Sequence, residues 1–233
     1  MFPFRRVMIA LLLFGVAFGY LEGAVVTYLR ALHEPARLRY YPDRAASEMF
    51  PMLTLDQLRT AAPAQEQTLY AEIGREAATI VMLAAIALAV ARNGRQWAAA
   101  FAIVFGVWDA VFYATLKVLL NWPASLLTWD ILFLIPLPWV GPVIAPVLVS
   151  LAMIAGGTWC LWREAAGRPL RVERRHSAGV LVGAFFIIVS FTLDHRNIMA
   201  GGSPQPFHWG VFALGMTIGM VSYGSAGLIR TRA

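Results

Sequence analysis

The sequence has very little of two reactive residue types and little charge. Among its 233 residues, cysteine occurs once, as Cys160, and lysine once, as Lys117. A single cysteine excludes an intrachain disulfide and a thiolate metal cluster. Only 14% of the residues are charged, whereas soluble domains carry about 25%. An ordinary soluble domain is therefore excluded.

Long apolar runs take the place of the missing charge. Hydrophobic residues make up 59% of the chain, and several runs approach the roughly 20 residues that cross a bilayer as a helix. These runs do not alternate between polar and apolar residues, as the strands of a barrel would. The sequence predicts an all-α fold, a polytopic membrane helical bundle whose backbone bonds are satisfied within each helix. Residues 1–233 are expected to form a single integral membrane domain.

Six transmembrane helices are predicted from the apolar runs. They span about Val7–Leu29, Glu72–Ala91, Trp97–Leu120, a fourth run ending near Trp162, Ser177–Leu193 and Trp209–Ile229. The first run is too long for the apolar region of a cleaved secretory signal.

Arginine predicts the orientation of this bundle. With both termini in the cytoplasm of a bacterial-type inner membrane, 11 of the 19 basic residues fall on cytoplasmic segments, as the positive-inside rule requires. The net charge of +6 is thereby explained without a nucleic-acid partner. The cytoplasmic residues are Arg5, Arg6, Arg92, Arg95, Arg163, Arg168, Arg171, Arg174, Arg175, Arg230 and Arg232.

A proline-rich stretch, WDILFLIPLPWVGPV, separates the third and fourth spans. From Asp130 to Trp162 a straight helix would be about 50 Å long, against a hydrocarbon core of about 30 Å. A full extra crossing would put Arg163–Arg175 outside, against the charge rule. We therefore expect a re-entrant or interfacial segment, or a kinked extension of the fourth span. An interfacial tryptophan anchor and a cavity wall are equally compatible with it.

Residues 30–71 are predicted to form an external loop that caps the bundle. Thr54 and Gln57 have the spacing of a capping box, which indicates a short helix. Pro63 suits the first turn of a helix that continues into the second span.

Glycines at four-residue intervals predict close helix contacts. Gly15, Gly19 and Gly23 form such a face on the first span, and Gly215 and Gly219 on the sixth. We expect these to be seams within one chain.

Ionisable residues within the spans are the strongest functional signal, because a charge at the membrane centre costs at least about 2.5 kcal/mol. With the predicted orientation they gather in the outer half. Glu22, Asp109 and Tyr113 are candidate catalytic residues, and Glu76, Lys117 and Asp130 are candidate ligand-binding residues. Two simpler interpretations compete with these functional roles. In one, Glu72 and Arg75 form an ion pair at the start of the second span. In the other, the Lys117 side chain extends to the membrane–water interface.

The acids of this outer set outnumber the fixed bases, so some must be protonated or balanced by a cation. Asp194, His195 and His208 flank one short external turn, and two histidines with a carboxylate suit zinc or non-haem iron. A divalent metal at these residues is one hypothesis. The simpler one is that the histidines only hydrogen-bond the turn.

Three classes of function remain open from the sequence alone. The favoured one is a multi-pass inner-membrane protein with a polar pocket, in the outer half of the membrane, that binds a ligand or a metal. A membrane-embedded metal-dependent hydrolase, or another enzyme acting on membrane lipid, is the first alternative. A non-catalytic subunit or assembly factor is the second. A transporter would need polar residues that lead to both faces, and these lead to one.

Overall fold

The computed structural model describes residues 2–45, 48–61 and 63–227. The chain is mostly helical, at 72%, as predicted. Five helices of the described residues are long and apolar enough to cross a membrane. Length and composition thus fit a membrane protein built from apolar helices.

The elements follow one another in an order close to the prediction. The long helices are α1 (Phe4–Tyr40), α3 (Pro63–Val90), α4 (Gly94–Leu120), α5 (Ile144–Ala165), α6 (Arg174–Thr192) and α8 (Trp209–Ser225), and the short ones are α2 (Leu55–Ala61) and α7 (His195–Met199). α8 has 17 described residues and is not among the five. Ile229, the predicted end of the last span, lies outside the described residues.

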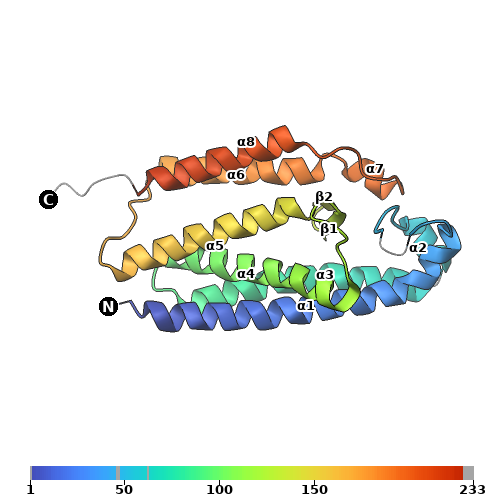
Figure 1. Ribbon diagram of the computed structural model, residues 1–233, viewed down its shortest axis with the longest axis horizontal. Helices are drawn as coiled ribbons and strands as arrows, with labels where there is room; N and C mark the ends of the chain where they lie inside the picture. Colours follow the sequence, from blue (N-terminus) through green and yellow to red (C-terminus); the bar gives the residue numbers. More distant parts are fainter. Residues whose placement is uncertain (1, 46–47, 62, 228–233) are drawn as a thin grey trace.

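Both ends of the described chain lie at the same end of the bundle (Figure 1). The start of α1, the α3–α4 and α5–α6 connections and the end of α8 lie there, and we call it the arginine-rich end. The opposite end, which we call the α2 end, carries α2, α7 and the strands β1 (Trp129–Phe133) and β2 (Trp139–Pro142). α4 is the central helix, with 61% of its most apolar window buried, against 22–33% for the other four candidate spans.

Four of the five glycines predicted to form seams, Gly15, Gly19, Gly23 and Gly215, pack closely within the chain, whereas a Cβ on Gly219 would have nothing within 4 Å. A Cβ atom on Gly19 would lie 2.6 Å from the carbonyl oxygen of Trp108 on α4. Gly15 and Gly23 also lie against α4, where the nearest atoms belong to the side chains of Val107 and Thr115. On the other pair of helices, a Cβ on Gly215 would lie 2.7 Å from the carbonyl oxygen of Gly183. The small residues therefore allow α1 to approach α4, and α6 to approach α8, backbone to backbone.

The proline-rich stretch forms one short β-hairpin within this mostly helical fold. β1 and β2 pair antiparallel, with Asp130 opposite Gly141 and Ile131 opposite Val140. Proline removes a helical N–H and clashes with the preceding turn, while the flanking aromatic and β-branched residues favour strands. Its five- and four-residue strands span less than about 20 Å each. The hairpin is thus neither a membrane crossing nor an extension of α5.

The predicted external loop is shorter than expected. α1 runs through Pro35 to Tyr40, so residues 30–40 are helical. The capping box is confirmed: the Thr54 backbone N–H donates to Gln57 Oε1 at 2.8 Å, and the Gln57 N–H donates to Thr54 Oγ1 at 3.3 Å. α3 begins at Pro63, as predicted.

Candidate functional site

A cavity of about 210 Å³ lies between α1, α3, α4 and the hairpin. It is at the α2 end, and the segment 49–58 forms part of its wall. Most of its surface is apolar, including Val26, Leu29, Met49, Met52, Leu53, Leu58 and Leu69. Its polar lining comprises Glu22, Arg30, His33, Arg37, Glu72, Arg75, Glu76, Thr79, Asp109, Tyr113 and Asp130.

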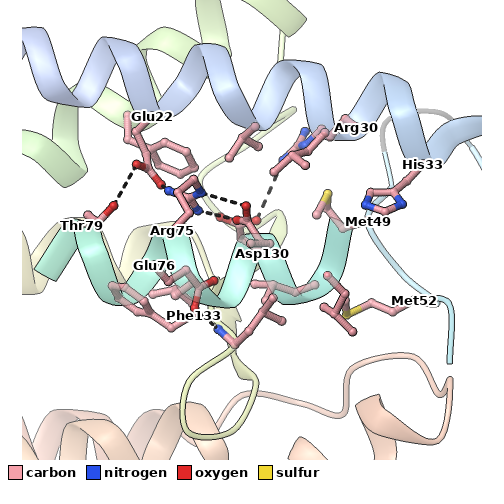
Figure 2. A pocket seen from close by; sticks show the side chains of 18 of the residues that line it. Glu22, Arg30, His33, Met49, Met52, Arg75, Glu76, Thr79, Asp130 and Phe133 are labelled. Carbon is pink, nitrogen blue, oxygen red and sulfur yellow. Dashed lines mark hydrogen bonds and ion pairs between the residues drawn. The ribbon is translucent and has the colours of Figure 1, made fainter. Parts of the chain in front are cut away.

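Arg75 links α1 and α3 on one wall of this cavity. Its guanidinium forms ion pairs with both Glu22 and Glu72, and its Nε donates to Glu72 Oε2 at 2.8 Å. Thr79 Oγ1 donates to the other Glu22 oxygen at 3.4 Å (Figure 2). The Glu72–Arg75 pair expected from the sequence is confirmed, and the same arginine also pairs with the deeper Glu22.

Asp130 connects the hairpin to two helices. It lies 4.0 Å from the Arg30 guanidinium on α1 and accepts a hydrogen bond of 3.0 Å from the Tyr113 hydroxyl on α4. Burial raises the pKa of Asp130 to about 6, although Arg30 and the Tyr113 hydrogen bond both lower it. Arg30 also stacks on the Trp122 ring, with its Cζ 3.9 Å from the ring centroid.

Two buried carboxylates on the cavity wall have no basic side chain within ion-pair distance among the described residues. Glu76 is 6% exposed and accepts the Leu134 backbone N–H at 2.8 Å. Asp109 is 8% exposed and accepts the Ser150 hydroxyl at 2.7 Å. Their hydrogen bonds are to neutral donors, so each carboxylate can still accept from a further partner.

Unpaired donors accompany these acids among the residues that line the cavity. The indole N–H of Trp108 and the Nε of Arg30 are buried and have no hydrogen-bond partner among the described residues. Trp108 is 5% exposed. Buried polar groups in proteins almost always have a partner. Among the described residues, the cavity lining thus contains acids outside ion-pair distance of a base and donor groups without acceptors.

The structure brings together most of the predicted site residues. Glu22, Glu76, Asp109, Tyr113 and Asp130 all line the cavity, and Ile131–Leu134 of the hairpin form one of its walls. Their predicted catalytic or ligand-binding roles remain predictions.

Lys117 is not among the residues that line the cavity. Its ammonium donates to the carbonyl oxygens of Asn121 and Pro123 at 3.4 and 3.0 Å, just beyond the end of α4. This position agrees with the simpler interpretation, in which the side chain extends from the end of its span.

The three residues predicted to bind a metal also lie away from the cavity lining. Asp194 accepts from Asn197 Nδ2 and the Gln205 N–H, which fixes the turn after α6. His195 Nδ1 lies 2.7 Å from the Thr192 carbonyl oxygen, and His208 immediately precedes α8. Within residues 2–45, 48–61 and 63–227, no three His, Cys, Asp or Glu side chains are grouped closely enough to hold a metal ion.

Arg30 is the main site residue that the sequence did not reveal. It was assigned to the external loop, because the apolar run ends just before it. A signal was present: Glu22, Val26, Arg30, His33 and Arg37 recur at three- and four-residue intervals and line the cavity from one face of α1. If the helical spacing of the first span is continued beyond the end of its apolar run, Arg30 falls on the same helix face as Glu22.

Comparison with protein-family models, with curated proteins and with solved structures gives no significant match to this chain. The function of this chain is therefore inferred from the geometry of the cavity.

Proposed function

We propose that this chain is a multi-pass inner-membrane protein that binds an amphiphilic ligand in the cavity at the α2 end. The observation that carries the proposal is the combination of buried carboxylates with a mostly apolar wall in one cavity. Ligand sites are usually concave, largely apolar, and provided with a few placed polar groups. An amphiphile matches both parts of this lining.

The charged residues of the cavity lining indicate which polar group the ligand carries. The lining contains the carboxylates Glu22, Glu72, Glu76, Asp109 and Asp130 against three arginines. Of these bases, Arg75 is held by Glu22 and Glu72, and Arg37 donates to the carbonyl oxygens of residues 48 and 49. Glu76 and Asp109 have no ion-pair partner among the described residues, and a ligand with a positively charged group would supply one.

The proposed orientation has six spans, with α8 as the sixth, and both termini in the cytoplasm. The arginine-rich end would then be cytoplasmic, in accordance with the positive-inside rule. The cavity would open in the outer half of the membrane, near the outer leaflet. The ligand would accordingly be a membrane lipid or a lipid-like molecule.

A cavity-filling substitution tests the proposal. Met52 lines the cavity, so Met52→Trp should occlude it. Met199 on α7 is 59% exposed and supplies the matched control, Met199→Trp. Each purified protein is depleted of lipid, titrated with total bacterial polar lipids in detergent, and examined by native mass spectrometry. We expect Met52→Trp to weaken lipid binding about tenfold, and Met199→Trp to bind as the wild type does. Equal binding by both variants and the wild type would contradict the proposal.

A further inference from the structure

Two kinds of unpaired polar group line the cavity: acids, which favour a positively charged partner, and a hydrogen-bond donor, which favours an acceptor. Glu76 and Asp109 are buried acids with no basic side chain within ion-pair distance among the described residues, and Trp108 is a buried donor without an acceptor there. A ligand with only a positive charge would satisfy the acids and leave the indole N–H unpaired. A ligand with only a negative charge would add to the excess of acid.

Trp108 differs from the other tryptophans with an unpaired indole N–H in its position on the cavity lining. The described residues contain three buried tryptophan N–H groups without a hydrogen-bond partner, those of Trp108, Trp122 and Trp139. Among these three, only Trp108 lines the cavity. It comes directly before Asp109 on α4, so a donor and an acid reach the cavity from adjacent positions.

Arg30 adds a second donor on the opposite helix. Its Nε is buried without a partner, and its closest carboxylate, Asp130, is 4.0 Å away. The guanidinium is stacked on Trp122, which holds its plane in place. Arginine is well suited to bind phosphate, because its N–H groups form a planar fork.

Resting on the proposed function above, we infer that the ligand is a zwitterion bearing a primary ammonium group and a phosphate, as in phosphoethanolamine. Glu76 and Asp109 accept from the ammonium, and the Trp108 N–H and Arg30 donate to the phosphate. The apolar walls contact only the part of the acyl chains next to the headgroup, because a cavity of about 210 Å³ is too small for whole chains. This contact favours the lipid form, phosphatidylethanolamine, over the free headgroup.

Headgroup preference tests the inference separately from cavity binding. Lipid-depleted wild-type protein in detergent is titrated with phosphatidylethanolamine, phosphatidylglycerol, phosphatidylcholine and water-soluble phosphoethanolamine, all followed by native mass spectrometry. We expect phosphatidylethanolamine to bind about tenfold or more tightly than the two other lipids, since charge-assisted hydrogen bonds distinguish them. Free phosphoethanolamine should bind much more weakly than the lipid. Tighter binding of the free headgroup would assign the site to a soluble molecule instead.

Isosteric variants identify the residues responsible. Glu76→Gln and Asp109→Asn keep an oxygen for Leu134 and Ser150, so each should fold and lose about tenfold in affinity for phosphatidylethanolamine only. Asp43→Asn, at an exposed acid outside the cavity lining, is their control. Trp108→Phe should weaken binding of all three phospholipids, whereas Trp139→Phe should not.

The outcomes separate the two proposals. A wild-type protein that binds the phospholipids without headgroup preference, with binding still lost in Met52→Trp, would overturn the zwitterion and leave the amphiphile site standing. If Glu76→Gln and Asp109→Asn both prefer phosphatidylethanolamine as the wild type does, the zwitterion is also overturned and the amphiphile site still stands. If Met52→Trp binds every lipid as the wild type does, the proposed function itself is wrong.

Discussion

The Tyr113 hydroxyl on α4 donates a 3.0 Å hydrogen bond to Asp130 on β1. Tyr113 is 6% exposed and Asp130 is 2% exposed, so both groups are removed from solvent. The bond fixes the hairpin against the central helix and closes the cavity on one side. Because the hairpin is bonded to α4 through Asp130, the charge of Asp130 affects the stability of the folded protein.

The stability of the protein should therefore depend on pH through Asp130. Its pKa rises from an ordinary 3.8 to about 6 because of burial. The groups that face it are Arg30 on α1 and Tyr113 and Asp109 on α4. Between about pH 4 and pH 6 the folded protein holds a proton that the unfolded chain has lost, so stability falls as the pH rises. The loss is roughly 3 kcal/mol at most.

Asp130→Asn isolates this contribution, because the asparagine oxygen still accepts from Tyr113 and does not titrate. Thermal unfolding of the wild type and the variant is compared in detergent from pH 4 to pH 7. We expect the melting temperature of the wild type to fall relative to that of Asp130→Asn as the pH rises. Parallel curves over this range would show that Asp130 does not titrate there.

Hydropathy predicted the long helices because a span needs only a continuous apolar run. The expected start of α8 at Trp209 and end of α4 at Leu120 match the structure. The continuation of α1 to Tyr40 was missed, since charged residues interrupt the apolar run in residues 30–40 and the helix there leaves no hydropathy signal. The hairpin was missed because its pairing joins Asp130 to Gly141, and no local periodicity records such a contact.

The cavity could be predicted in part, since a carboxylate within an apolar run must find a polar neighbour. That argument selected Glu22, Glu76 and Asp109, which line one cavity. A separate argument, that two histidines and a carboxylate suit a metal, selected His195 and His208, which lie at the two ends of a turn and are not among the residues that line the cavity. Arg30 was missed, because an arginine at the end of a span is normally an interfacial residue.

Glu22 and Arg75 should be strongly coupled, because they form a largely buried pair between α1 and α3. Arg75→Gln leaves Glu22, which is 6% exposed, without its cation, and should cost about 3–5 kcal/mol. Glu22→Gln should cost less, because Arg75 keeps Glu72. The double variant should be more stable than the sum of the two effects by about 1–3 kcal/mol.

Thermal or denaturant unfolding in detergent measures this cycle. Arg95→Gln is the control, because its pair with Glu164 lies at the arginine-rich end with the arginine side chain 41% exposed, and such pairs contribute at most about 1 kcal/mol. Additive effects of Glu22→Gln and Arg75→Gln would show that the pair is not coupled.

Gly19 should not tolerate even one added methyl group. A Cβ there would lie 2.6 Å from the Trp108 carbonyl oxygen and 2.8 Å from Val111 Cβ. Gly19→Ala should therefore separate α1 from α4 and cost about 1–3 kcal/mol. Gly74→Ala is the matched control, since nothing lies within 4 Å of its Cβ position, and alanine there should stabilise α3 by about 0.5–1 kcal/mol. Equal melting temperatures for the two variants would contradict the close seam.

The proposed orientation places the α2 end outside and the arginine-rich end in the cytoplasm. Cys160 is the single native cysteine, so Cys160→Ala provides a background for introduced cysteines. Asp43 and Arg171 are exposed residues in the α1–α2 and α5–α6 connections. In intact bacterial cells, a membrane-impermeant maleimide should label Asp43→Cys and not Arg171→Cys, because the positive-inside rule keeps Arg163–Arg175 in the cytoplasm. Permeabilised cells should label both, which controls for reactivity. Labelling of Arg171→Cys alone in intact cells would reverse the orientation and place the cavity in the inner half of the membrane.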